Sequence, residues 1–377
     1  MELSATQAAI RETVREFAVE EVRPTLRECD REERFPEEVW DGLADLDLTG
    51  LTTPEAYGGF DADRLTYAVV NKELAYGSLA VATALSVHCL ATSCIAEFAD
   101  ESLREEYLPE MVDGRPVGAF ALSEPDAGSN PAEMSTEARS VDGGDAYVID
   151  GTKQWITNGS RAGVVVLFAK TDANDPETVT QFLVPADADG LQVGEKEDKL
   201  GLRASDTVSL TFDGVRIPAE YRLTEVGRGL AAAFRILTGG RVGIAAQSVG
   251  LARAALEEAV DYAGEREQFD QPIKEFQAIR HKVADMAVKV ENARHLVYNA
   301  ARRCDDGESF ETEASMAKLY SSEAAREVAS EAVQIHGGYG YTRDFPVEMH
   351  YRDAKGLEIY EGTSEVQRNI IADRILD

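Results

Sequence analysis

One carboxylate near the carboxyl end of the chain is well placed for proton chemistry. Residues 359–368 read Ile-Tyr-Glu-Gly-Thr-Ser-Glu-Val-Gln-Arg, so Glu361 directly precedes a glycine. Ser364 and Gln367 have the spacing of a capping box, which predicts a helix from about 365 to 376 and leaves Glu361 on the preceding loop. There the carboxylate lies near the positive helix end, and the glycine lets a ligand approach. The segment predicts either a proton-transfer site or a carboxylate that only complements the helix dipole.

Two segments nearer the middle of the chain could hold an anionic ligand. Residues 120–129 read Phe-Ala-Leu-Ser-Glu-Pro-Asp-Ala-Gly-Ser, so a predicted strand ends in a turn that presents N–H groups and hydroxyls. Residues 155–157 read Trp-Ile-Thr and put an apolar plate beside a hydroxyl in the next β segment. By themselves, these patterns also describe an ordinary strand exit and a core tryptophan.

Two more segments lie at the ends of long predicted helices. Arg266 and Phe269, followed by Gln277, stand between two such helices, and a guanidinium offers rigid paired donors for a diphosphate. Residues 334–340, Gln-Ile-His-Gly-Gly-Tyr-Gly, end a helix with glycines that can adopt positive φ and admit a ligand. We interpret His336 as a structural partner of this helix end.

Together these segments resemble the acyl-CoA dehydrogenase family, residues 359–368 almost letter for letter. The resemblance implies FAD-dependent conversion of a fatty acyl-CoA to a trans-2-enoyl-CoA. It implies that Glu361 removes the α-proton, that flavin N5 receives a hydride from the β-carbon, and that the N–H of Glu361 supports the thioester oxygen. The chemistry needs such a base, an acceptor and preorganised donors.

The same resemblance implies roles for individual residues. Cofactor contacts are implied for Leu122, Ser123, Ser129, Trp155, Ile156, Thr157, Arg266, Phe269, Gln277, Gln334, Gly337, Gly338, Thr363 and Glu365. Substrate contacts are implied for Ser129, Arg241, Tyr360 and Gly362, and no metal ligand is implied. Relatives use the residues matching Arg266, Phe269 and Gln277 on the FAD of a neighbouring subunit, so a homotetramer, a dimer of dimers, is expected.

The chain departs from the family pattern at Asn130 and Thr238, where Asp is common, and at Asp270, where Gly is usual. Some family members carry the base immediately before the arginine that matches Arg241. That position is Gly240 here, so no alternative carboxylate is available. Glu361 is therefore predicted to be the sole base.

The acyl group is weakly encoded. Ala82, Thr83 and Ser86 match the helix that floors the acyl site in relatives, and their small size favours short to medium chains, including branched ones. Branched-chain, glutaryl-type and carrier-protein thioester dehydrogenases stay open as alternatives, as does a non-catalytic assembly protein of the same fold. The last would be expected to lose Glu361 or the flavin loops, and both are present. Electron-transferring flavoprotein is the implied electron acceptor.

Composition excludes two classes of partner. The 377 residues include 69 acidic and 38 basic side chains, a net charge of −31, so nucleic acid and anionic membrane surfaces would repel the chain. Acidic residues spread along the whole chain are typical of a protein kept soluble in high salt. We expect a cytoplasmic protein of a halophile, with no signal peptide and with four reduced, buried cysteines that lack metal-site spacing.

The apolar period changes twice along the chain. Helical spacing dominates residues 4–113 and returns from residue 229, whereas the intervening residues show a period of two, with Asp-Gly turns at 142, 150 and 213. Residues 78–96 could span a bilayer by length, but their Ala, Ser and Thr content favours a buried helix. We predict an α+β fold with an N-terminal helical domain (1–113), a central β domain (114–223) and a C-terminal helical bundle (224–377). The family fold has this order, with a β-barrel before a four-helix bundle.

Overall fold

The computed structural model describes residues 2–376. The chain begins with six α-helices, most of which bury side chains in one of two apolar clusters. They are α1 (Ala5–Phe17), α2 (Leu26–Glu32), α3 (Glu37–Asp45), α4 (Arg64–Gly77), α5 (Leu79–Phe98) and α6 (Glu101–Val112). Within residues 2–376, α5 is the one helix long and apolar enough to cross a membrane, but 83% of its most apolar window is buried. It packs against α4, α7 and β1, so the prediction of a buried helix is confirmed.

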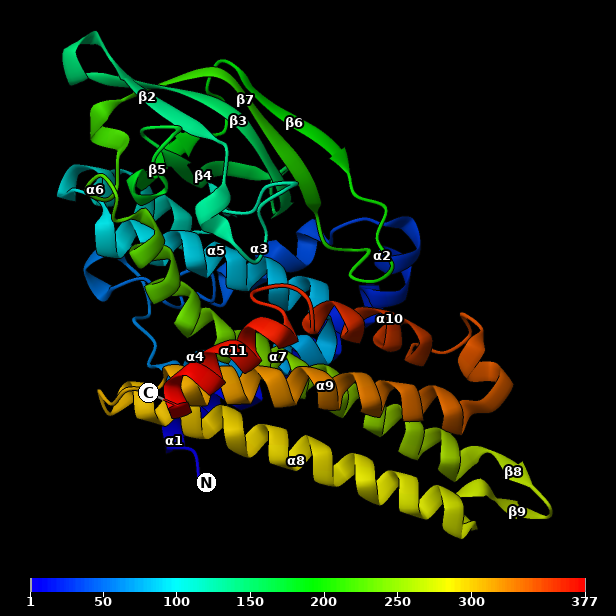
Figure 1. Ribbon diagram of the computed structural model, residues 1–377. Coiled ribbons are helices and arrows are strands. Elements are labelled where there is room, and N and C mark those ends of the chain that lie inside the picture. Colours follow the sequence, from blue (N-terminus) through cyan, green and yellow to red (C-terminus); the bar gives the residue numbers. More distant parts are fainter. Residues whose placement is uncertain (1, 377) are drawn as a thin grey trace.

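Seven strands then form one mixed sheet, drawn at the top of Figure 1. They are β1 (Val117–Ala121), β2 (Glu137–Val141), β3 (Ala146–Thr157), β4 (Ala162–Lys170), β5 (Val179–Pro185), β6 (Leu191–Lys196) and β7 (Thr207–Pro218). The order is β1-β4-β2-β3-β7-β6, and β5 lies off this path and pairs with β4. One face buries Leu167, Phe182 and Leu210, and alternation along the strands explains that face.

Two of the predicted turns are wrong. Asp150-Gly151 and Asp213-Gly214 lie inside β3 and β7, where the pairing register shifts between Ile149 and Gly151. Asp150 Oδ1 accepts from the N–H of Gly214 at 2.9 Å, so the two Asp-Gly pairs face each other across a bulge. The paired strands override the local turn preference, whereas residues 142–144 do turn between β2 and β3. Strands β2 and β6 were not predicted because their side chains are mostly exposed.

Five helices complete the chain and confirm the predicted α+β order. They are α7 (Gly229–Glu265), α8 (Gln277–Asp305), α9 (Glu311–His336), α10 (Val347–Leu357) and α11 (Ser364–Leu376), with a short hairpin of β8 (Glu267–Gln268) and β9 (Gln271–Pro272) between α7 and α8. Glycines on α7 allow close approach of α4, since a Cβ at Gly243 would lie 2.8 Å from the Tyr67 ring. Figure 1 shows the hairpin at the opposite end of the molecule from the sheet.

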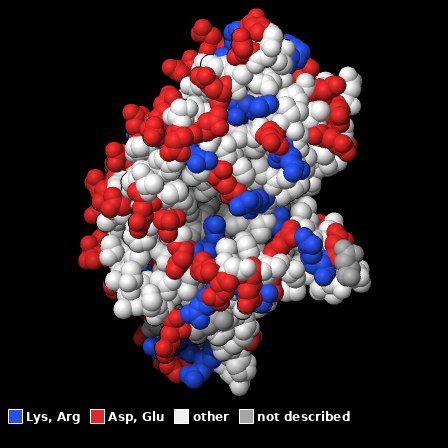
Figure 2. All heavy atoms as spheres, turned by 90° about the vertical axis from the view of Figure 1, so that its left-hand side faces the viewer, with Lys and Arg blue, Asp and Glu red and all other residues white. Residues whose placement is uncertain are grey.

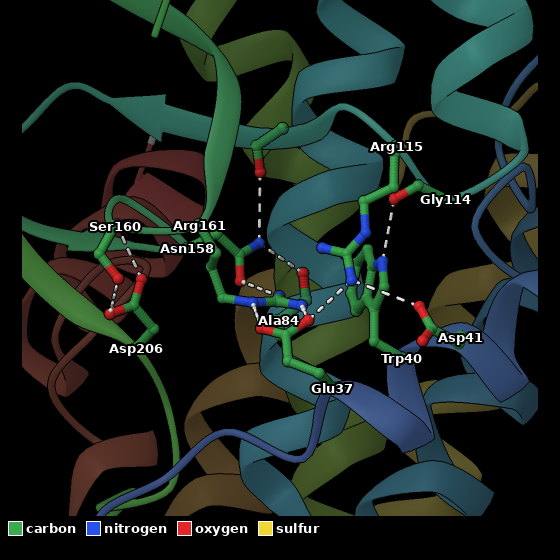
Figure 3. Close-up of polar contacts among 11 residues, drawn as sticks. Glu37, Trp40, Asp41, Ala84, Gly114, Arg115, Asn158, Ser160, Arg161 and Asp206 are labelled. Carbon is green, nitrogen blue, oxygen red and sulfur yellow. Dashed lines mark hydrogen bonds and ion pairs between the residues drawn. The ribbon is translucent and has the colours of Figure 1, made fainter.

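A polar network ties the turn after β3 to the N-terminal helices (Figure 3). Asn158 follows β3 and donates from Nδ2 to the carbonyl of Ala84 on α5 at 2.9 Å. Arg161 pairs with Glu37 on α3 through two hydrogen bonds, and its guanidinium stacks over Trp40. The end of β3 is thereby held on the helix that carries Thr83 and Ser86.

The surface is strongly acidic, as the composition requires. Figure 2 shows acidic side chains across one face of the molecule, with basic side chains around the hollow in its middle. Cys29, Cys89 and Cys94 are buried, but Cys304 near the end of α8 is only half-buried, so the expectation of four buried thiols is wrong there. All four are free thiols.

Candidate active site

The loop between α10 and α11 has a tightly held backbone. Glu361 has φ +52° and Gly362 has φ +90°, so two consecutive residues adopt the left-handed conformation. That conformation costs free energy for a residue with a side chain. The Gly362 carbonyl accepts from Lys318 Nζ at 2.7 Å and from Gln367 Nε2 at 3.0 Å, and these bonds stabilise the loop.

The predicted capping box is wrong in its partners. Thr363 Oγ1 accepts from the N–H of Val366 at 3.3 Å and caps α11, which begins at Ser364. The Ser364 hydroxyl is buried without a partner in the part of the chain that the structure describes. Gln367 is turned toward the loop, so its side chain holds the Gly362 carbonyl rather than the helix start.

Glu361 is half-buried, and its carboxylate is unpaired. Its Oε2 is inaccessible to solvent, and no hydrogen bond to either carboxylate oxygen comes from residues 2–376. Burial raises the pKa of Glu361 to about 7, although the positive charges of Lys318 and Arg241 oppose that rise. Such a carboxylate has a proton affinity suited to general-base chemistry near neutral pH.

The carboxylate faces Gly240 on α7, the position at which some family members carry the base. A Cβ at Gly240 would lie 2.7 Å from Glu361 Oε2 and 3.3 Å from the side chain of Leu90. The next residue, Arg241, is buried, and its Nη1 has no partner among the described residues. The fold thus brings Arg241 and Tyr360 to the surroundings of Glu361.

Sequence reasoning missed Lys318, a fully buried lysine on α9 beside this loop. Burial lowers its pKa to about 8, and Glu361 opposes that change. One signal was available, because Lys318 falls on an apolar stretch of the helix among buried Ala314, Ala317 and Ser321. A lysine at such a position is uncommon unless it is paired.

The segments predicted to face the flavin lie side by side. The N–H of Gln154 donates to the carbonyl of Ser123 at 3.0 Å, and Lys153 Nζ donates to the carbonyl of Leu122 at 3.1 Å. These bonds hold the loop after β1 against β3. Trp155 sits at a register shift in β3 with φ +63°, and 59% of its surface is exposed. A tryptophan plate pushed out of the sheet is better explained by a binding surface than by a core.

The remaining residues of these segments differ in exposure. Ile156 is buried in the sheet, and Thr157, at the end of β3, is half-buried. Ser129 is exposed on the loop after β1, and Glu365 is exposed in the first turn of α11.

A second group of predicted residues surrounds a pocket of about 500 Å³ near the β8–β9 hairpin. Arg266, Gly337 and Gly338 line it, and a Cβ added at either glycine would meet nothing within 4 Å. The other three residues predicted here, Phe269, Gln277 and Gln334, are exposed and lie outside its lining. The lining residues that sequence reasoning missed include Tyr262, Gln268 and Tyr339.

The hairpin and the helix end beside this pocket form as the residues allow. Phe269 and Asp270 both have positive φ and make the two-residue turn, so Asp replaces the usual Gly without loss of the turn. His336 stacks on Tyr262 with ring centroids 4.2 Å apart and shares a hydrogen bond with the Ala332 carbonyl. These contacts agree with a structural role for His336.

Larger side chains surround the small residues of α5. The hydroxyls of Ser86 and Tyr67 lie 3.0 Å apart, and Thr83 Oγ1 donates to Gln247 at 3.2 Å. The Tyr360 hydroxyl is buried without a hydrogen-bond partner among the described residues. Tyr67, Gln247 and Tyr360 therefore occupy part of the space that small residues on α5 would leave open.

A β domain between two helical domains, with an unpaired buried carboxylate before the last helix, defines the class of this protein. Family models describe three successive regions as the N-terminal, middle and C-terminal domains of acyl-CoA dehydrogenase, over residues 4–115, 119–215 and 227–376. The chain belongs to the acyl-CoA dehydrogenase family.

Individual relatives agree. The chain is 42% identical to the short-chain specific acyl-CoA dehydrogenase of Bos taurus, over 100% of this chain and 91% of that protein. The solved butyryl-CoA dehydrogenase of Megasphaera elsdenii matches with a TM-score of 0.96 and 39% identity, over 100% of both chains. An acyl-CoA dehydrogenase of Bacillus anthracis, solved with FAD, matches with a TM-score of 0.94 and 32% identity, over 100% of this chain and 67% of that one. This protein is an acyl-CoA dehydrogenase, an oxidoreductase acting on CH–CH donors, and its cofactor is FAD.

Proposed function

We propose that this enzyme dehydrogenates a short-chain acyl-CoA between Cα and Cβ, with Glu361 as the base that removes the α-proton. The observation that carries the proposal is the unpaired Glu361 carboxylate, whose Oε2 is buried opposite Gly240. No acceptor within residues 2–376 pairs with the N–H of Glu361, so this donor is available to a thioester oxygen. The base and the N–H donor then belong to one residue. Lys318 and Gln367 hold the adjacent carbonyl of Gly362.

The residues around β3 fit a flavin. Trp155 presents an exposed plate, and the neighbouring Leu122-Ser123 loop is fixed by bonds to its carbonyls. In this proposal Leu122, Ser123, Ile156 and Thr157 contact the ring system, and Thr363 and Glu365 approach it from the start of α11. Bound FAD supplies the acceptor for the hydride of the β-carbon.

The pocket at Arg266 suits the diphosphate end of FAD, because a guanidinium pairs with phosphate oxygens and two glycines leave the wall open. The hairpin lies far from β3 in Figure 1, which supports the proposal that this pocket serves the FAD of a neighbouring subunit in a tetramer. Arg266→Ala should then lose FAD and weaken the oligomer together. Normal FAD content with an intact tetramer would contradict the assignment.

Short acyl groups are favoured because Tyr67, Gln247 and Tyr360 fill space beside α5. The 42% identity to a short-chain specific relative supports the same choice. Anaerobic flavin bleaching by acyl-CoAs of increasing length and branching should be fastest with butyryl-CoA. Arg64 packs against Gly239, one residue from Gly240, so glutaryl-CoA belongs in the panel. Electron-transferring flavoprotein is the proposed acceptor of the flavin electrons.

The base assignment is tested by Glu361→Gln, which keeps the size of the side chain and removes its basicity. Stopped-flow flavin reduction by butyryl-CoA should slow by about 10²–10⁴-fold while FAD stays bound. Flavin reduction at a rate close to that of the unmodified enzyme would refute the assignment.

A further inference from the structure

Lys318 is a buried cation that no carboxylate neutralises directly. It has no exposed surface, and among residues 2–376 no Asp or Glu oxygen lies within 4.0 Å of its Nζ. The ammonium instead donates to the carbonyl of Gly362 at 2.7 Å. Burying an ammonium without a direct counter-ion destabilises the folded state. Stability therefore does not account for a lysine at this position.

The hydrogen bond acts on the backbone of the catalytic loop. Glu361 and Gly362 both adopt the left-handed conformation, and the Gly362 carbonyl receives one donor from α9 and one from α11. Gln367 is the second, uncharged donor at 3.0 Å. Because both donors hold the same carbonyl, they fix the loop that directs the Glu361 carboxylate toward Gly240.

Few other charges reach that carboxylate. Lys318 on α9 and Arg241 on α7 are the cations that act on the pKa of Glu361, and both oppose its rise by burial. Tyr67 on α4 and the adjacent Tyr360 also face Glu361, but burial raises the pKa of both phenols, so they are neutral at pH 7. The two cations thus set the electrostatic environment of the base.

Acidic residues other than Glu361 do not neutralise Lys318 either. Glu358 pairs with Arg326 at 2.6 Å and with Lys355 at 2.5 Å, and Glu365 is exposed. Arg241 is the other buried cation, and its Nη1 is unpaired within the described chain. Lys318 is therefore the cation that both lies near Glu361 and donates a hydrogen bond to the carbonyl of the next residue, Gly362.

We propose that Lys318 is a positioning residue for dehydrogenation, which holds the Glu361 loop through the Gly362 carbonyl and acts on the carboxylate as a nearby positive charge. The proposal rests on Glu361 being the base. It keeps the carboxylate unpaired and free to accept a proton, because the ammonium is bonded to the backbone and lies more than 4.0 Å from either carboxylate oxygen. It also keeps Glu361 ionised to a lower pH than burial alone would allow.

The test compares FAD-loaded Lys318→Met, Lys318→Gln and Lys318→Arg with the unmodified enzyme in anaerobic flavin reduction by butyryl-CoA between pH 5 and 9. Removing the charge should move the pH midpoint of the rate upward by about one unit, and the rate at pH 6 should fall about tenfold. In Lys318→Arg, which keeps the positive charge, the pH midpoint should lie close to that of the unmodified enzyme. Gln367→Ala should slow reduction at every pH and leave the midpoint in place, since it removes a donor but no charge.

A second measurement needs no turnover. The melting temperature of each protein is compared with that of the same protein carrying Glu361→Gln, and the pH dependence of the difference reports the ionisation of Glu361. Its midpoint should also move upward in Lys318→Met and Lys318→Gln. The matched control is Lys72→Met, which removes a buried lysine that pairs with Glu73 at 2.8 Å. It should lower the melting temperature without moving either midpoint.

Unchanged midpoints in both uncharged variants would overturn the proposal. If Lys318→Met does not fold, Lys318→Gln decides the question alone. If neither uncharged variant folds, and Lys318→Arg folds but has an altered pH midpoint, then Lys318 is only a structural residue. Failure of the base assignment is distinguishable, because Glu361→Gln in the unmodified background would then keep its activity. If Glu361→Gln loses activity but the pH midpoints do not move in the Lys318 variants, the role proposed for Lys318 is refuted and Glu361 is retained as the base.

Discussion

Glu124 and Glu361 both bury carboxylate oxygens near a buried lysine, yet the protein holds their pKa values on opposite sides of the ordinary value. Glu124 accepts from the N–H and hydroxyl groups of Ser135 and Thr136 and from Lys153 Nζ at 2.8 Å. Burial alone would raise the pKa of Glu124, but Lys153 and these donors lower it to about 2. Glu361 has no such partner, and burial raises its pKa to about 7.

The difference shows that a buried lysine nearby does not decide what a buried carboxylate does. Lys153 donates to the Glu124 carboxylate itself, whereas Lys318 donates to a backbone carbonyl beside Glu361. Satisfied hydrogen bonds stabilise the ionised form, and their absence leaves the desolvation cost uncompensated. The first arrangement fixes the loop after β1, and the second leaves a carboxylate able to take up a proton.

Moving the proposed base from Glu361 to position 240 tests whether the surroundings of the carboxylate, and not its place in the sequence, make it a base. Glu361→Ala should lower flavin reduction by at least about 10²-fold. Adding Gly240→Glu should recover about tenfold or more, since a Cβ there points at the vacated carboxylate position. Alanine is required in this test because the longer side chain left by Glu361→Gln would meet that Cβ. Gly239→Glu is the matched control, because its Cβ would meet Arg64 at 2.8 Å and should recover nothing. Equal recovery by both variants would contradict this geometry.

Breaking the paired carboxylate should instead cost stability. Lys153→Met leaves Glu124 buried without its cation and removes the donor to the Leu122 carbonyl. We expect a loss of about 3–5 kcal/mol in the free energy of unfolding, with weaker retention of FAD. Lys282→Met, which removes a partly exposed pair with Glu331, should cost less than about 1 kcal/mol. Denaturant unfolding of both variants measures the difference, and similar losses would count against the buried pair.

Removing the charge of Glu361 should have the opposite effect on stability. Its pKa is raised from 4.5 to about 7 in the folded protein, so stability present below pH 4.5 is lost as the pH rises through 7. One pKa unit corresponds to about 1.4 kcal/mol, which sets an upper bound of about 3.5 kcal/mol on this effect. Glu361→Gln should therefore melt at a higher temperature than the unmodified protein at pH 8 and near the same temperature at pH 4.5. A difference independent of pH would exclude an unpaired buried carboxylate.

Added salt should affect the acidic surface much more than the two buried carboxylates. The net charge of −31 is mostly exposed and repels itself, and screening shortens the Debye length to about 3 Å in 1 M salt. The melting temperature should rise by several degrees between about 0.1 and 2 M KCl, whereas the pH midpoint of flavin reduction should move little. An unchanged melting temperature would rule out the predicted dependence on high salt.

Several features of the site could be predicted from residues close together in the sequence. The period of apolar residues indicated the helices, and the residues after Glu361 indicated that it stands on a loop just before the last helix, where the structure has it. The Arg266 segment was expected between two helices, and it lies between α7 and α8. Such features depend on backbone preferences within a few residues, so one segment carries enough information to predict them.

Features that depend on distant partners could not be predicted in this way. Gln367 has the spacing of a capping residue, but its amide donates to the Gly362 carbonyl, which Lys318 of the distant helix α9 also holds, and Thr363 caps the helix instead. Asp150-Gly151 has the sequence of a turn, but pairing of β3 with β7 holds it inside a strand. At Asp150-Gly151 the neighbouring strand satisfies the polar groups that a local turn would otherwise pair.

The sequence by itself determined that a carboxylate stands on a loop between helices, because the residue types of that segment impose the loop and the helix that follows. Tertiary structure alone decided that this carboxylate is unpaired, faces Gly240 and lies near Lys318 and Arg241. The pKa of a buried group depends on desolvation and on charges brought by other elements, and these enter only when α7, α9 and α11 pack together.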